Sequence, residues 1–101
     1  MSDTNTREEL ALSVDEAEWQ WLKPHLERGS LITVAAVLDL AEAAERIAAD
    51  DAAQVGAWIG SNKVGKPTAE QIAAWDKTPK KKFLMLIISP YVLIQELGIM
   101  N

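Results

Sequence analysis

The sequence predicts a single α+β domain in which a small mixed sheet of two to four strands is covered by three to five helices. The 101 residues suffice for one packed core but not for two. Helix-start signals recur along the chain, and two segments rich in β-branched or apolar residues have the length of strands. Residues 1–101 are therefore expected to form one domain, with residues 1–6 disordered.

The first predicted helix begins at Ser13 or Asp15, because each is followed three residues later by a glutamate that can complete a capping box. The helix reaches Arg28 and ends at Gly29, a residue suited to the left-handed conformation that closes many helices. Proline lacks an amide hydrogen and clashes with the preceding turn. We therefore expect a break or a fresh start within residues 21–24, which end in a proline.

Three further helices are predicted from short polar side chains that precede a Glu or Gln by three residues. Asp39 begins a helix whose apolar residues repeat at three- and four-residue spacing, and Asp51 begins a second helix that abuts it and ends at Gly60. Thr68 begins the third helix, which ends at residues 77–79. Capping alone explains the two aspartates.

Two segments are predicted to pair as neighbouring strands, with the helices that begin at Asp39 and Asp51 packed on them. Residues 30–36 are rich in β-branched side chains, and residues 83–88 form an apolar run typical of a central strand covered on both faces. Residues 91–97 are ambiguous: their β-branched content suits a strand, but the proline before them and the glycine after them favour a short helix. Residues 64–66 are expected to add a brief edge strand.

The net charge of −5 is unevenly distributed along the chain. Residues 1–51 hold twelve acidic and four basic residues, whereas residues 52–101 hold three acidic and six basic ones. An acidic first half argues against general nucleic-acid affinity, because such domains gain affinity by neutralising phosphates with a basic face. The basic residues of the second half are Lys63, Lys66, Lys77, Lys80, Lys81 and Lys82.

Residues that carry common catalytic chemistry are scarce in this chain. The absence of cysteine excludes disulfides, thiolate catalysis and cysteine-bound zinc. His25 is the single histidine and stands in no metal-binding motif, and no serine has the sequence context of a nucleophile. Asp50 has no evident capping role, so it is the acidic residue with the strongest claim to a function. We assign no catalytic, cofactor-binding or metal-binding residue.

The four tryptophans are unusual beside one phenylalanine and one tyrosine. Trp58 and Trp75 fall on apolar helical faces and are predicted to lie in the core, where large rings bury the most area. Trp19 and Trp21 are two residues apart and cannot share one helix face. One of this pair is therefore expected to be partly exposed and available to a partner.

Both ends of the chain bear on its location. Residues 1–9 are polar and acidic, which is not the pattern of a secretion signal, so we expect a cytoplasmic protein. Residues 83–100 are apolar enough to suggest a tail anchor, but Pro90, Gln95 and Glu96 interrupt them. An acid at the centre of a membrane span costs about 3 kcal/mol on insertion scales, so we do not expect a membrane anchor.

Several segments together suggest a family. The order of Trp19, Leu38-Asp39-Leu40, Ile47-Ala48-Ala49-Asp50-Asp51, Trp58 and Pro90-Tyr91-Val92-Leu93-Ile94-Gln95-Glu96 resembles a small family of uncharacterised bacterial proteins, known as a domain of unknown function. The resemblance spans nearly the whole chain. It implies a bacterial cytoplasmic protein, and it supplies no catalytic residue.

The sequence leaves three classes of function open. The first is a non-enzymatic interaction or regulatory module that uses an exposed tryptophan or a sheet edge and is a monomer or a weak homodimer. The second is weak binding of nucleic acid or another anionic partner through the lysines from Lys63 to Lys82. The third is an unrecognised enzyme or metal binder that uses Asp50 and His25. The candidate interaction residues are Trp19, Trp21, Asp50, Lys80, Lys81 and Lys82.

Overall fold

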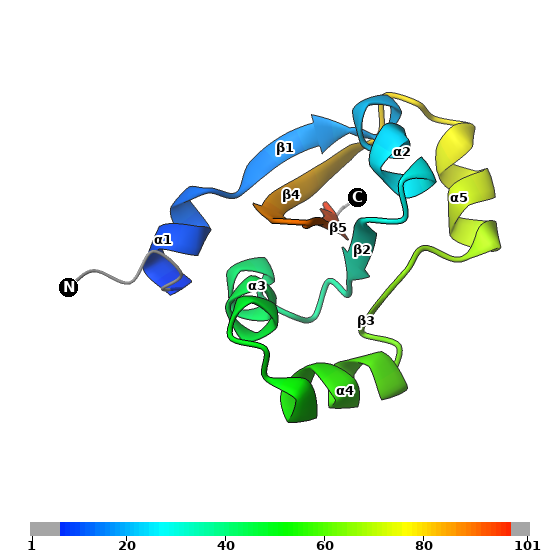
Figure 1. The fold of residues 1–101 in the computed structure, drawn as a ribbon. Coiled ribbons are helices and arrows are strands. Elements are labelled where there is room, and N and C mark those ends of the chain that lie inside the picture. Colours follow the sequence, from blue (N-terminus) through cyan, green and yellow to red (C-terminus); the bar gives the residue numbers. More distant parts are fainter. Residues whose placement is uncertain (1–6, 98–101) are drawn as a thin grey trace.

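The computed structural model describes residues 7–97, and the predicted disorder of residues 1–6 falls outside this range. Five helices and five strands alternate irregularly along these residues (Figure 1). In chain order the elements are α1 (Arg7–Leu12), β1 (Asp15–Glu18), α2 (Trp19–Glu27), β2 (Leu31–Val34), α3 (Leu40–Ala48), α4 (Ala52–Gly60), β3 (Val64–Gly65), α5 (Ala69–Asp76), β4 (Lys82–Ile88) and β5 (Tyr91–Glu96).

The strands form one mixed sheet in the order β1-β4-β5-β2-β3. Neighbouring strands are antiparallel except for β2 and β5, which run parallel with Leu31 opposite Val92 and Thr33 opposite Ile94. The α+β class and the edge strand β3 are confirmed. The predicted two to four strands fall short by one, because β1 was not foreseen.

Residues 91–97 were left open between a strand and a short helix, with the helix favoured, and the favoured alternative was wrong. They supply β5, the central strand, which separates β2 from β4. The predicted pairing of residues 30–36 with residues 83–88, and the central place given to the latter, were therefore also wrong. Residues 92–95 are all at least nine-tenths buried, so both faces of this segment are covered, which a strand at the centre of a sheet allows.

The predicted helix start at Ser13 or Asp15 was also wrong. Residues 15–18 pair with β4 as the edge strand β1, and α2 begins at Trp19 and continues through Pro24 without the expected break. A proline inside a helix costs about 3 kcal/mol. Burial of Trp19 and Leu22 against the sheet offsets this cost, since each large apolar side chain contributes about 1.5–3 kcal/mol.

The helix starts predicted from capping residues are confirmed. Asp39 accepts a hydrogen bond from the third amide of α3 at 3.0 Å, and Asp51 does so for α4 at 3.2 Å. Thr68 and Gln71 form both hydrogen bonds of a capping box, at 3.1 and 2.9 Å. These signals are local in the chain, which is why the sequence alone identifies them.

Helices cover both faces of the sheet, so the domain has three layers and two cores (Figure 1). One core joins the sheet to α1, α3 and α4, and the other joins it to α2 and α5. The first contains Leu10, Val34, Ala43, Trp58, Leu86 and Leu93. The second contains Trp19, Leu22, Leu31, Trp75, Phe83 and Ile94. Trp58 and Trp75 are thus buried as predicted.

Three aromatic rings form the centre of the second core. The ring of Trp75 meets those of Trp19 and Phe83 edge-on, with centroids 5.0 and 4.9 Å apart. The Trp19 Nε1–H donates to Asp76 Oδ1 at 2.8 Å, and Lys23 Nζ lies 3.0 Å from the same oxygen. The hydrogen bond from Trp19, followed by that from Lys23, lowers the pKa of Asp76 from its ordinary value of 3.8. Asp76 thereby links α5 to α2.

This link predicts a pH-dependent effect of Asp76→Asn. The pKa of Asp76 is lower in the folded than in the unfolded protein, so its charge stabilises the fold above pH 3.8 and loses this effect as the pH falls through the folded-state pKa. We expect the variant to melt at a lower temperature than the wild type at pH 7, with the difference shrinking toward pH 3. Thermal melts across this range measure it. A difference that is constant with pH would show that the charge has no part in the link.

Candidate functional site

An apolar groove lies on the side of the sheet that carries α3 and α4. Its volume is about 630 Å3. The acidic side chains of Asp50 and Asp51 flank it at one place, and Lys66 flanks it at another. Its apolar walls come from Ile32, Ile47, Val55, Ile59, Val64 and Tyr91. We refer to these six residues as the apolar groove.

The groove exists because α4 does not lie flat on the sheet. α4 packs against α3 and β3, and Trp58 is the only one of its nine residues that is buried. The prediction that α4 packs on the sheet is therefore confirmed only at the edge strand β3. The side chains of Ile59 and Tyr91 remain 54% and 41% exposed. Apolar surface is thus left uncovered between α4 and the sheet.

Asp50 lies at the rim of the groove and has a structural role that its sequence context did not reveal. It adopts a left-handed backbone conformation, with φ of 59°, between α3 and α4. Its amide donates to the carbonyl of Ile47 at 3.1 Å, and the amide of Asp51 donates to that of Arg46 at 3.0 Å. This pair of hydrogen bonds closes a helix at its carboxyl end, as Gly29 does for α2. The Asp50 side chain itself is exposed.

The two tryptophans of α2 differ in exposure as predicted. Trp19 is 1% exposed and belongs to the core, whereas Trp21 is 60% exposed. Helical spacing places Trp21 on one outward stripe with His25 and Arg28. Trp21 is therefore the member of the pair that a partner can reach, and it lies on the opposite side of the sheet from the apolar groove.

The lysine cluster does not form a uniform basic face. Lys81 Nζ lies 3.4 Å from Glu96 Oε1 and 5.6 Å from the centroid of the Phe83 ring. Lys82 begins β4 opposite Glu18 of β1. Carboxylates therefore lie near Lys81 and opposite Lys82. Lys80 is exposed and precedes β4.

Asp50 and His25 do not come together. His25 belongs to α2 and Asp50 follows α3, and these helices cover opposite faces of the sheet. Among residues 7–97, no group of three or more histidine, aspartate and glutamate side chains is arranged to hold a metal ion. In the same range no helix is long and apolar enough to cross a membrane, and the segment considered as a tail anchor supplies β4 and β5.

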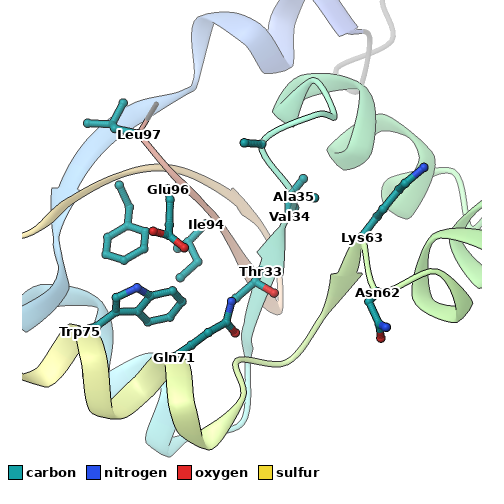
Figure 2. A pocket seen from close by; sticks show the side chains of 12 residues that line it. Thr33, Val34, Ala35, Asn62, Lys63, Gln71, Trp75, Ile94, Glu96 and Leu97 are labelled. Atoms are coloured by element: carbon teal, nitrogen blue, oxygen red, sulfur yellow. The ribbon is translucent and has the colours of Figure 1, made fainter. Parts of the chain in front are cut away.

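A second pocket, of about 380 Å3, opens at the carboxyl ends of β2 and β5 (Figure 2). Thr33, Gln71, Trp75 and Glu96 contribute polar groups to its lining. The sequence indicated only a cap for Gln71 and a core position for Trp75. The pocket itself was not predicted, because it depends on the parallel pairing of β2 and β5.

Comparisons with known proteins give a family and a similar solved structure. A family described as a protein of unknown function (DUF2288) matches residues 5–96. The NMR solution structure of PA1075 from Pseudomonas aeruginosa is similar to this chain, with a TM-score of 0.80 and 28% sequence identity. The match covers 98% of this chain and 90% of that one. No curated protein matches the chain.

The backbone of Asp50 predicts opposite effects of two substitutions. A left-handed conformation costs an ordinary side chain about 1–2 kcal/mol, and glycine avoids this cost. We expect Asp50→Ala to lower the free energy of unfolding by about 1 kcal/mol, since alanine lacks the local polar contacts that help aspartate in this conformation. Asp50→Gly should keep or raise it. Urea unfolding measures both, and equal losses in the two variants would contradict the structural role.

Proposed function

This chain belongs to the DUF2288 family of proteins of unknown function, and we propose that it is a non-enzymatic protein-interaction module of the bacterial cytoplasm that binds its partner in the apolar groove. The exposure of Ile59 and Tyr91 beside a volume of about 630 Å3 carries the proposal. Contiguous apolar surface with a charged rim is typical of sites where proteins bind one another. Tyrosine is also among the residues that contribute most to such interfaces.

The rim of the groove favours a partner segment of a particular kind. Asp51 pairs with Arg46 at 3.5 Å, whereas Asp50 makes no ion pair within residues 7–97. A segment with aliphatic side chains for the groove and a lysine or arginine for Asp50 would match both features. Burial of the aliphatic side chains would supply most of the affinity, because an exposed ion pair contributes only about 0–1 kcal/mol.

The other hypotheses about function have less support. Binding of an anionic partner requires a basic face, and Lys81 is already paired with Glu96. An enzyme that uses Asp50 and His25 would need them on one side of the sheet. The outward stripe with Trp21 offers a second contact surface, but a single ring on a helix offers less apolar surface than the apolar groove. A homodimer formed through the groove would be one form of the proposed interaction.

Photo-crosslinking in the living bacterial cell is the first step in testing this proposal. A photo-crosslinking amino acid at Ile59 should capture a protein that the same group at Val37 does not, since Val37 is 79% exposed but does not line the groove. Titration of the purified partner should then show Ile59→Glu binding at least tenfold more weakly, which is about 1.4 kcal/mol. Val37→Glu is the matched control and should bind within twofold of the wild type.

Two results would contradict the proposal that the partner binds in the apolar groove. One is an Ile59→Glu variant that melts like the wild type and binds the partner equally well. The other is equal loss of binding in the Val37→Glu control, which would place the interface elsewhere. Sedimentation of the protein alone at low and high salt identifies the homodimer: a dimer held by the groove persists at high salt, because apolar burial is not screened.

A further inference from the structure

The second pocket has the position and size of a small-molecule site. It lies at the carboxyl ends of the parallel neighbours β2 and β5, the edge where open α/β sheets commonly bind ligands. Its volume of about 380 Å3 falls within the usual range of about 300–1,000 Å3 for such sites. Residues of α5 border the pocket, and it shares no lining residue with the cavity that holds the apolar groove, so its ligand would differ from the partner proposed for the groove.

Two N–H donors in the pocket have no partner within the described part of the chain. Trp75 is only 4% exposed, yet its indole N–H makes no hydrogen bond there, unlike that of Trp19. Because no inaccessible side-chain nitrogen lacks a partner in this range, the Trp75 Nε1 is accessible, and Trp75 lines the pocket. The oxygen of the Gln71 amide accepts from Thr68, which leaves its NH2 group for a ligand. Both N–H groups are therefore free to donate to a ligand in the pocket.

A carboxylate faces the same space. Figure 2 shows the carboxylate of Glu96 directed toward Trp75, with Gln71 on the neighbouring side. One oxygen of Glu96 lies 3.4 Å from Lys81 Nζ, and its side chain is 48% exposed, so the other oxygen can accept from a ligand. Lys63 also lines the pocket, but Figure 2 shows its ammonium directed away from Glu96. The pocket therefore offers a negative group and, next to it, neutral N–H donors.

We propose that this pocket binds a small zwitterion, a free α-amino acid. Its ammonium group donates to Glu96, and its carboxylate accepts from the Trp75 and Gln71 N–H groups, with Lys81 adding positive charge nearby. An ammonium alone would leave the two donors unpaired, and a carboxylate alone would face Glu96 without compensation. The complementarity requires both charges in one molecule.

The indole N–H signals of the tryptophans give a direct readout. Free L-amino acids, added one at a time to 15N-labelled protein at up to about 10 mM, should shift the Trp75 indole signal saturably for at least one of them. The Trp21 indole is the internal control and should not move, because it is exposed on α2 outside the pocket. The amine that lacks the carboxylate and the acid that lacks the amine should each bind at least tenfold more weakly. No shift of Trp75 with any amino acid, or equal binding of either analogue, overturns the proposal.

Three variants test the assigned partners. Glu96→Gln removes the charge that the ammonium needs, and Gln71→Glu replaces the free donor while keeping an oxygen for the Thr68 amide. Each should weaken binding at least tenfold and melt within a few degrees of the wild type. Glu70→Gln is the matched control, since Glu70 lies on α5 but does not line the pocket, and it should bind like the wild type. Unchanged affinity in Glu96→Gln would overturn the assignment of the ammonium.

Discussion

The burial of β5 on both faces is the constraint on which the rest of this fold depends. Residues 92–95 are each no more than 8% exposed, and the strand pairs with β4 on one side and β2 on the other. Gln95 is the one polar side chain among them. Its amide nitrogen donates to the carbonyls of Ala35 and Leu38, at 2.8 and 2.7 Å, and so fixes the loop between β2 and α3. A buried amide whose nitrogen donates to two carbonyls in this way favours one arrangement of the loop.

Both candidate surfaces follow from this central strand. Its parallel pairing with β2 creates the edge where the second pocket opens, and its first residue, Tyr91, contributes to the apolar groove. Because successive residues of a strand point to opposite faces, β5 contributes to both cores, while the helices divide between them. The groove and the second pocket therefore lie on separate parts of one sheet. A partner protein and a small ligand would not compete for the same atoms.

Local signals in the sequence were sufficient for part of this structure. Thr68 and Asp39 predicted helix starts correctly because a cap and its amides are only three residues apart. Residues 91–96 were misread because their state is decided by neighbours from distant parts of the chain, and residues 15–18 became a strand only by pairing with β4. The structural role of Asp50 was not predicted, because a left-handed backbone conformation cannot be recognised from the sequence when the residue is not glycine. Both pockets depend on long-range pairing and could not be read from spacing.

Hydrogen exchange of the β5 amides tests the central claim most directly. If β5 organises both cores, the amides of Leu93 and Ile94 exchange only when the whole protein unfolds, so their opening free energy equals the free energy of global unfolding. The edge strand β1, paired on one side, should exchange through smaller openings. The contradictory result is exchange of Leu93 and Ile94 at a lower free energy than the amides of α3 or β4, because the two cores would then persist without β5.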